Sequence, residues 1–313
     1  MGKQLAGAGD HRGSTEQPGG RRGVVRFLHN EAAPAASRMV LGNALRHLRE
    51  DCNLLQQDVA TRLGRSTSKI SRIETGTFNS KDGELEEFFA IYDVSDPASQ
   101  YELRELASVA NQPAWWQRWS PVAQRYLQAV VSFEDMAQRI RSYEALYLHG
   151  LLQAPAYGQA VIKRGRGGPH VHDDLWELRK ERQARFNAAE NKSLVCVVDE
   201  ATLLRPVDSS PTTMRQQIEH LLELMDDPRY QLRLAELGNY RVNVELGSTT
   251  VFDFAQQILP TIAYAEAFDG GLIIQDEMMV DRRVKEFDAL RAASLAPPAT
   301  RRKLHDLLRT HYR

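Results

Sequence analysis

Apolar residues recur at every third or fourth position through the first third of the chain, a spacing that predicts amphipathic helices. The pattern is interrupted four times, so we expect five helices, at Val40–Cys52, Gln56–Leu63, Thr67–Thr75, Asp82–Tyr92 and about Pro97–Asn111. The apolar positions expected to face the core are Leu41, Leu45, Leu48 and Cys52 in the first helix, Val59, Ala60 and Leu63 in the second, and Leu85, Phe88, Phe89, Tyr92, Leu103, Leu106 and Val109 in the last two. Together these helices predict an all-α domain over residues 40–111.

The pattern changes after "NQPAWW", which breaks the helical spacing near Gln112. Helices are expected at Arg125–Ala145, over the charged run "DDLWELRKERQARF", at Thr212–Met225 and at Val280–Ala292. Short β-rich runs stand between them: "SLVCVVD", "YQLRLAEL", "RVNVELG", "TIAYAEAF" and "GGLIIQD". This alternation predicts a larger α+β (mixed) domain over residues 112–313.

The second and third helices are separated by a corner with specific turn residues. Gly64 can take the positive φ that a tight helix-to-helix corner needs, and Ser66 is a good N-cap for the helix that follows. Gly76 ends that helix. Ile70 and Ile73 mark its inward side, so the opposite side is predicted to face solvent.

That solvent side carries small side chains first and cations further on. At about 100° per residue, Ser68 and Arg72 point away from the isoleucines, with Thr67 and Lys69 beside them. Short side chains let a helix approach the major groove of DNA, and an arginine can bond two acceptors of guanine. Gln56, at the start of the preceding helix, stands where backbone N–H groups favour a phosphate.

The stretch "LLQQDVATRLGRSTSKISRIETG" closely resembles the helix-turn-helix of the lambda-repressor-like, Xre-type regulators. The matching positions are Gln56, Ala60, Leu63, Gly64, Ser66, Ile70, Ser71, Glu74 and Gly76. The resemblance implies base contacts by Thr67, Ser68, Lys69 and Arg72, and phosphate contacts by Gln56 and Thr75. Arg65 stands where relatives usually have an aliphatic residue and would add a phosphate contact. The loop "TFNSKDG" lacks the basic sequence usual there, which implies fewer contacts.

The larger domain also resembles a known family. "YLHGLLQAPAYGQAVI", "VVDEATLLRPV", "MRQQIEHLLEL" and "YAEAFDGGLIIQD" are similar to the actinobacterial domain of unknown function that follows Xre-type helix-turn-helix motifs. In that family's signature a threonine stands at the position of Ala154 and an alanine at that of Gly158. Any role of the threonine hydroxyl is therefore in doubt for this chain. The resemblance implies a transcriptional regulator, often encoded beside a small partner protein.

Charge is distributed unevenly although the net charge is only −1. Residues 1–39 carry six Lys/Arg against three acids with almost no apolar periodicity, which predicts a flexible cationic arm. Residues 40–73 also hold six bases and three acids, whereas residues 81–111 hold two bases and eight acids. Positive charge is therefore gathered on the proposed DNA-contacting part, ahead of an acidic segment.

Other classes of function find little support in the sequence. No apolar run reaches the roughly 18 to 20 residues of a membrane span and no secretory signal precedes the domain, so a cytoplasmic location is expected. Cys52 and Cys196 fit reduced core thiols. No phosphate-binding or nucleophile-elbow motif occurs, and we expect no catalytic residue, no metal and no cofactor. Three clusters favour structural roles: "HVHDD" (His170, His172, Asp173, Asp174) as an exposed loop, Asp199 and Glu200 as caps, and Trp115, Trp116 and Trp119 as packing anchors.

The sequence thus predicts a sequence-specific DNA-binding transcriptional regulator, with the helix at residues 66–75 in the major groove of double-stranded DNA. A small helix-turn-helix buries little surface, so a homodimer on two half-sites is expected, with the second domain serving dimerisation and the sensing of an effector or small protein. The cationic arm would add salt-sensitive attraction to DNA. The alternative is an antitoxin-like or scaffold protein that holds a small partner, with DNA binding secondary.

Overall fold

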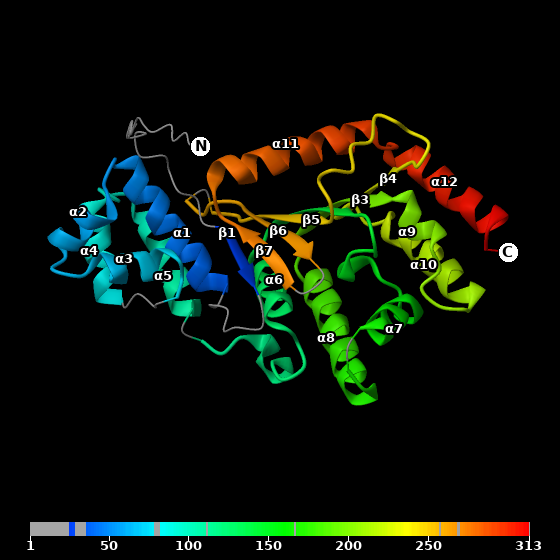
Figure 1. Ribbon diagram of the computed structural model, residues 1–313, viewed down its shortest axis with the longest axis horizontal. Coiled ribbons are helices and arrows are strands. Elements are labelled where there is room, and N and C mark those ends of the chain that lie inside the picture. Colours follow the sequence, from blue (N-terminus) through cyan, green and yellow to red (C-terminus); the bar gives the residue numbers. More distant parts are fainter. Residues whose placement is uncertain are drawn as a thin grey trace, which may run out of the picture.

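The computed structural model describes residues 25–28, 36–77, 82–110, 112–165, 167–256, 258–267 and 270–312. A domain of helices lies at one end of the molecule and a larger domain built on a β-sheet at the other (Figure 1). The expectation of a flexible arm falls mostly on residues outside the described ranges, as does much of the loop "TFNSKDG".

The helical domain contains the five expected helices. They are α1 Ala36–Asp51, α2 Gln56–Arg62, α3 Thr67–Glu74, α4 Asp82–Ile91 and α5 Pro97–Ala110. Helix α1 begins within the segment expected to be an arm, because its first turn buries Ala36 and Met39 and packs toward the sheet domain. The predicted core positions of α4 are all buried, as are Leu103 and Leu106 of α5.

Two predicted core residues of this domain are exposed instead. Val109 is 52% exposed, because α5 buries the stripe that also contains Ala107 and Ala110 and so turns Val109 outward. Cys52 is exposed because α1 ends at Asp51 and Asn53 takes a positive φ of 55° in the turn. Cys196, by contrast, is buried as expected.

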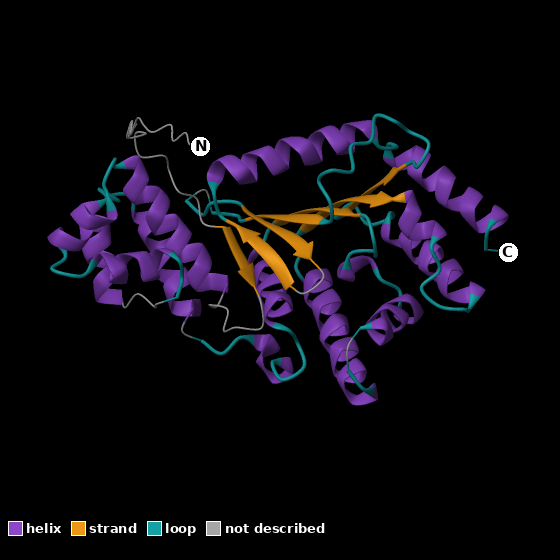
Figure 2. Cartoon of the chain, in the orientation of Figure 1, coloured by secondary structure: helices purple, strands orange, loops and turns teal. Residues whose placement is uncertain are grey.

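The larger domain is built on the sheet drawn in orange in Figure 2. Its seven strands follow the order β1-β7-β6-β5-β2-β3-β4. Their ranges are β1 Val25–Leu28, β2 Arg139–Glu144, β3 Ser193–Asp199, β4 Tyr230–Ala235, β5 Thr249–Asp253, β6 Ile262–Ala267 and β7 Gly270–Ile274. Strands β2, β3 and β4 run parallel, and the other neighbours are antiparallel. The mixed sheet with helices agrees with the predicted fold class.

Helices cover both faces of the sheet (Figure 1). Helix α11 (Glu277–Ala293) lies along one face, where its Phe287 packs with Tyr143 and Val197 of the sheet. The other face is covered by α6 (Arg125–Met136), α7 (Pro155–Arg164) and α8 (Pro169–Ala188) with the short helices η1 (Trp115–Trp119) and η2 (Gly150–Leu152). Helices α9 (Glu200–Leu204), α10 (Pro211–Leu224) and α12 (Pro297–Thr310) complete the fold around β3 and β4. The core on this face is continuous with that of the helical domain.

Three predicted elements of this domain are wrong in detail. The helix expected to reach Ala145 ends at Met136, and residues 139–144 form β2, because Ile140 and its neighbours pair with β3 and β5. The run "RVNVELG" forms turns, and strand β5 begins only at Thr249. The segment "HVHDD" is not a loop but the first turns of α8, which Pro169 opens at its first position.

The N-terminal segment connects the two domains. Val25–Leu28, which was expected to belong to the flexible arm, pairs antiparallel with β7 as an edge strand of the sheet. The chain then enters α1 of the helical domain. At the same place Gln275, just beyond β7, donates a 2.9 Å hydrogen bond from Nε2 to the carbonyl oxygen of Met39 in α1. The helical domain is therefore held to the sheet through the start of α1.

Candidate nucleic-acid interface

Helices α2 and α3 form the predicted corner. Gly64 has a φ of +61°, which a residue with a Cβ adopts only with strain. Ser66 caps α3, its Oγ accepting the backbone N–H of Lys69 at 3.2 Å. At the start of α2 the carboxylate of Asp58, inside the helix, reaches back and accepts the N–H of the N-cap residue Leu55 at 2.8 Å. The turn residues thus set the angle between the two helices.

Close backbone contacts seat α3 on α1. Ile70 and Ile73, on the inward side of α3, are fully buried. A Cβ on Gly42 of α1 would lie 2.3 Å from the carbonyl oxygen of Ile73, and a Cβ on Gly76 would lie 2.7 Å from the backbone nitrogen of Met39. Gly76 also has a φ of +70°. Glycine is therefore required on both sides of this contact, and the sequence motif indicated only Gly76.

A buried ion pair ties the ends of these helices together. Arg49 of α1 donates from Nε and Nη2 to the carboxylate of Glu74 in α3, at 2.6 and 2.9 Å. Arg49 also donates to the carbonyl of Leu54, and Gln56 of α2 donates to Glu74 at 2.7 Å. Burial disfavours the charge on Arg49, but Glu74 raises its pKa overall. Sequence reasoning placed Glu74 in the motif and missed Arg49.

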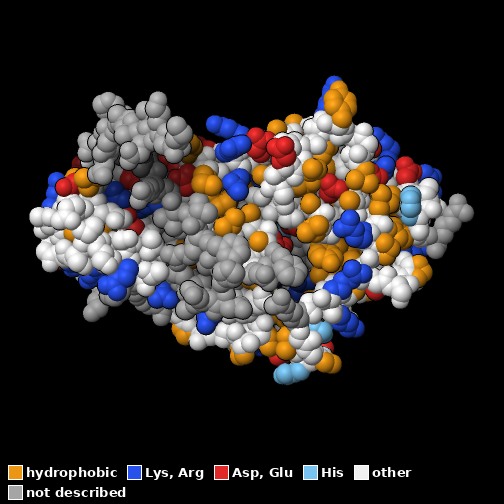
Figure 3. Space-filling model, in the orientation of Figure 1, with side chains coloured by type: hydrophobic (Ala, Val, Ile, Leu, Met, Phe, Trp, Pro, Cys, Tyr) orange, Lys and Arg blue, Asp and Glu red, His pale blue; other side chains and the backbone are white. Residues whose placement is uncertain are grey.

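The outward side of α3 carries the four residues predicted to contact bases. Ser68 and Arg72 are exposed, and Thr67 and Lys69 are partly buried beside them. The hydroxyl of Thr67 donates to Gln57 Oε1 at 2.6 Å, which fixes its rotamer. Figure 3 shows Lys and Arg side chains in blue along the lower edge of the helical domain. The structure therefore brings these four residues to one face of one helix.

The three residues predicted to contact phosphates are each engaged within the domain. Gln56 bonds Glu74, and the hydroxyl of Thr75 donates to the carbonyl of Ser71 at 2.9 Å. Arg65 forms ion pairs with Glu84 and with Glu87, the latter at 2.7 Å. All three are partly buried: Gln56 and Thr75 lie at the two ends of the α2–α3 unit and Arg65 in the turn between the helices, so they frame α3 rather than line its outward side.

Glu84 of α4 was not anticipated as a neighbour of this face. Its carboxylate pairs with Arg65 and accepts a 2.5 Å hydrogen bond from Nζ of Lys69. One buried carboxylate therefore holds two cations that the sequence assigned to DNA. The acidic composition of residues 81–111 was the available signal, but it could not tell which acid turns back toward α3.

The sheet domain contains a second cluster of buried charges, under α8. Glu134 of α6 accepts two bonds from Arg182, at 2.9 and 2.6 Å, and His149 Nε2 lies 3.5 Å from the same carboxylate. Burial alone would raise the pKa of Glu134, but Arg182 and His149 lower it overall. Burial lowers the pKa of His149 to about 4 and raises that of Glu144 to about 8.

The residues with favoured structural roles occupy structural positions. Asp199 caps α9 through the N–H of Ala201 at 2.9 Å, and Glu200 binds Lys303 at 2.9 Å. The tryptophans pack with Val131 and Leu178 in one apolar cluster. Within the described ranges, no three His, Cys, Asp or Glu side chains are grouped so as to hold a metal ion. Nor does any helix placed by the structure have the length and apolar character to cross a membrane.

The fold and the arrangement of α2 and α3 define a helix-turn-helix protein with a mixed α/β domain attached. Residues 40–100 match the family described as "Helix-turn-helix domain". Residues 127–306, more than half of the chain, match the family described as "Domain of unknown function (DUF5753)", and the chain belongs to that family. No curated protein and no solved structure matches the chain. The helix-turn-helix match supports a DNA-binding regulator.

Proposed function

We propose that this protein is a sequence-specific transcriptional regulator that lays α3 in the major groove of double-stranded DNA. The observation that carries the proposal is the outward side of α3, where small side chains precede a cation on a helix whose other side is locked to α1. A rigid helix with this profile suits groove entry. The proposal assigns the protein no catalytic activity.

Within this proposal Thr67, Ser68, Lys69 and Arg72 approach base edges, and Gln56, Arg65 and Thr75 approach phosphates. Arg72 is the candidate for two hydrogen bonds to guanine, a contact that discriminates between bases by about 1–3 kcal/mol. Gln56 stands at the N-terminus of α2, where backbone N–H groups favour an anion, whereas Thr75 is the C-cap of α3 and would reach a phosphate through its hydroxyl. Gln56 keeps one amide contact to Glu74, which orients it before DNA arrives.

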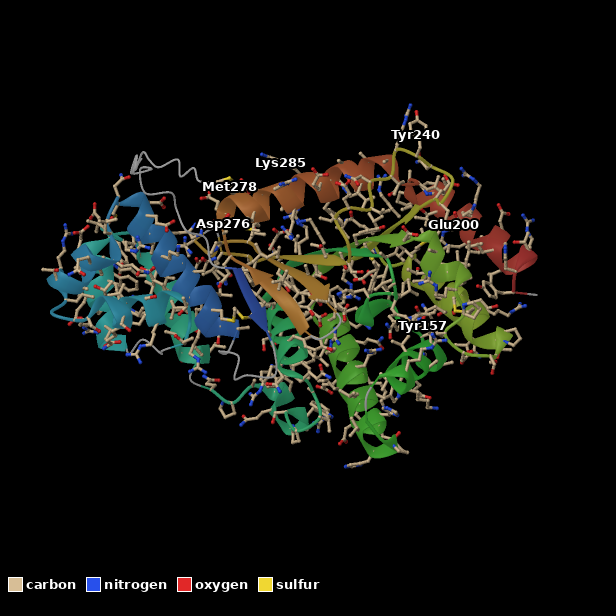
Figure 4. The ribbon with its side chains drawn as sticks, in the orientation of Figure 1. Tyr157, Glu200, Tyr240, Asp276, Met278 and Lys285 are labelled. Atoms are coloured by element: carbon tan, nitrogen blue, oxygen red, sulfur yellow. The ribbon has the colours of Figure 1, made fainter. Side chains whose placement is uncertain are left out.

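We further propose a cytoplasmic homodimer on two half-sites. The apolar side chains of Leu237, Tyr240 and Val244 are more than half exposed on the loop between β4 and β5, and they offer a surface for self-association. Tyr240 projects from the top of the molecule in Figure 4. Light scattering across a concentration series tests this part, and a monomer at every concentration would remove it.

Selection from a random DNA pool tests the proposal directly. A regulator enriches a defined site with paired half-sites, whereas a scaffold for a partner protein enriches none. On the selected site, Arg72→Ala is expected to relax the preference at one base position by about tenfold or more, as the loss of a bidentate contact implies. Gln56→Ala should weaken binding to all sequences alike.

A matched control is Arg104→Ala, which removes one positive charge from the acidic side of the same domain, where Arg104 pairs with Glu86. It should leave base preference unchanged. If Arg72→Ala and Gln56→Ala both bind the selected site as the parent does, α3 does not read DNA in the way proposed.

A further inference from the structure

A pocket of about 250 Å³ opens where the two domains meet. The helical domain contributes Ala36 from the first turn of α1 and Val109 from the last turn of α5. The sheet domain contributes Trp115 and Trp116 of η1 and Met136 of α6. We call this space the junction pocket. Its volume is slightly below the roughly 300–1,000 Å³ typical of drug-sized ligands, and such sites favour domain interfaces.

The walls of the junction pocket define what it can hold. They are mostly aromatic and aliphatic, and the one ion pair among the lining residues, Arg185 with Asp135 at 3.1 Å, is already satisfied. Trp116 donates its indole N–H to Ser132 at 2.7 Å. The indole N–H of Trp115 is buried and finds no hydrogen-bond acceptor in the part of the chain that the structure describes. A buried donor without an acceptor is unfavourable, so a ligand oxygen that reached this N–H from the pocket would satisfy it.

Helix α1 connects the junction pocket to α3. Its first turn lines the pocket at Ala36 and Ser37. Two residues further, Met39 accepts the hydrogen bond from Gln275, and its backbone nitrogen is the close neighbour of Gly76. Asp276, which follows Gln275 and is labelled in Figure 4, marks this place at the start of α11. A shift of the first turn of α1 is therefore felt at the end of α3.

We propose that the junction pocket binds a small, mainly apolar ring compound with one carbonyl or similar acceptor oxygen, and that α1 transmits its occupancy to α3. The assignment of this ligand as an effector rests on the proposed function, since its effect on DNA presupposes DNA binding. The pocket itself is defined by apolar walls, limited volume and one unused donor, and it can be tested without DNA.

The probe is 2-acetylnaphthalene, with 2-ethylnaphthalene as the same shape lacking the carbonyl. Binding is followed by NMR on the full chain with ¹³C-methyl methionine, which gives seven reporters. Met136 lines the pocket, Met39 reports on α1, and Met225 at the C-cap of α10 belongs to neither. The Met136 and Met39 signals are expected to shift while that of Met225 stays in place. The ketone should bind about three- to tenfold more tightly, the effect of one neutral hydrogen bond.

Three variants decide the outcome. Val109→Phe fills the pocket and should abolish both shifts, whereas Val244→Phe makes the same change at an equally exposed valine in the β4–β5 loop and should not. Trp115→Phe should remove the advantage of the ketone. The proposal is overturned if no Met136 shift occurs, if Val109→Phe binds like the parent, if Met39 stays in place on binding, or if the ketone keeps its advantage in Trp115→Phe. None of these results depends on DNA, so a failure of DNA selection remains a separate finding.

Discussion

Each domain buries an arginine–glutamate pair in bidentate contact, but the surroundings of the two pairs differ. Arg49 and Glu74 in the helical domain are completed by an amide and a backbone carbonyl. Arg182 and Glu134 in the sheet domain lie among further ionisable groups, including His149. The first pair fixes the geometry of three helices. The second lies in an interior whose stability depends on whether its ionisable side chains carry a proton.

The largest effect is expected from breaking either pair. Glu74→Ala and Glu134→Ala each leave an arginine buried without its carboxylate, and each should lower the free energy of unfolding by about 3–5 kcal/mol. Urea denaturation followed by circular dichroism measures it. Glu86→Ala, which breaks the exposed pair with Arg104, should leave the midpoint nearly unchanged. If the two buried variants were as stable as this control, neither pair would hold its domain together.

The seating of α3 on α1 is tested by adding a single methyl group. Gly42→Ala places a carbon 2.3 Å from the carbonyl oxygen of Ile73, so α3 must move, at a cost of about 1–3 kcal/mol. Gly83→Ala in α4 meets no atom within 4 Å and should be neutral or stabilising, as alanine suits a helix better. Thermal unfolding compares the two. Equal melting temperatures would show that α1 and α3 are not in tight contact.

The sheet domain should respond to pH through Glu144. Its pKa is about 8 in the folded protein against 4.5 ordinarily, chiefly because of burial. Between these values the folded state keeps a proton that the unfolded chain has lost, so stability falls as pH rises toward 8, by at most about 1.4 kcal/mol per unit. Glu144→Gln should remove this slope when melting temperatures are compared from pH 6.5 to 9.

Two features keep the pH experiment specific. His149 has a lowered pKa of about 4, so its own contribution is lost as pH falls below about 6.5, outside the range measured. Glu245→Gln changes an exposed carboxylate in the β4–β5 loop and should follow the parent. A Glu144→Gln variant with the slope of the parent would mean that Glu144 ionises normally in the folded protein.

The smallest effect is expected from Glu84 of the helical domain and concerns the affinity for DNA. Glu84 holds both Arg65 and Lys69, so Glu84→Gln should free positive charge for DNA and raise affinity several-fold in low salt, with a steeper salt dependence. Glu105→Gln removes an equal charge from an exposed site on α5. Fluorescence anisotropy with a selected DNA site measures both. If Glu105→Gln raised affinity as much, only net charge would matter, and the position of Glu84 would not.

The sequence located the helices of the helical domain because that information is local. Apolar spacing, Gly64, Ser66 and Gly76 indicate where each helix begins and ends, and the side of α3 opposite Ile70 follows from helix geometry alone. The same reasoning gave α8, α10, α11 and four of the strands of the other domain. The prediction failed at β2, where the local pattern favoured a helix but pairing with β3 and β5 makes the segment a strand.

Tertiary structure alone decided the contacts between segments far apart in the chain. The pairing of β1 with β7, the hydrogen bond from Gln275 to Met39 and the return of Glu84 to Lys69 each join residues whose separate patterns give no sign of a partner. A side chain's periodicity says which way it faces, but not what it meets. The sequence therefore determined α3 and its outward side, and the fold determined which residues hold α3 in place, which acid neutralises its lysine and how it connects to the rest of the protein.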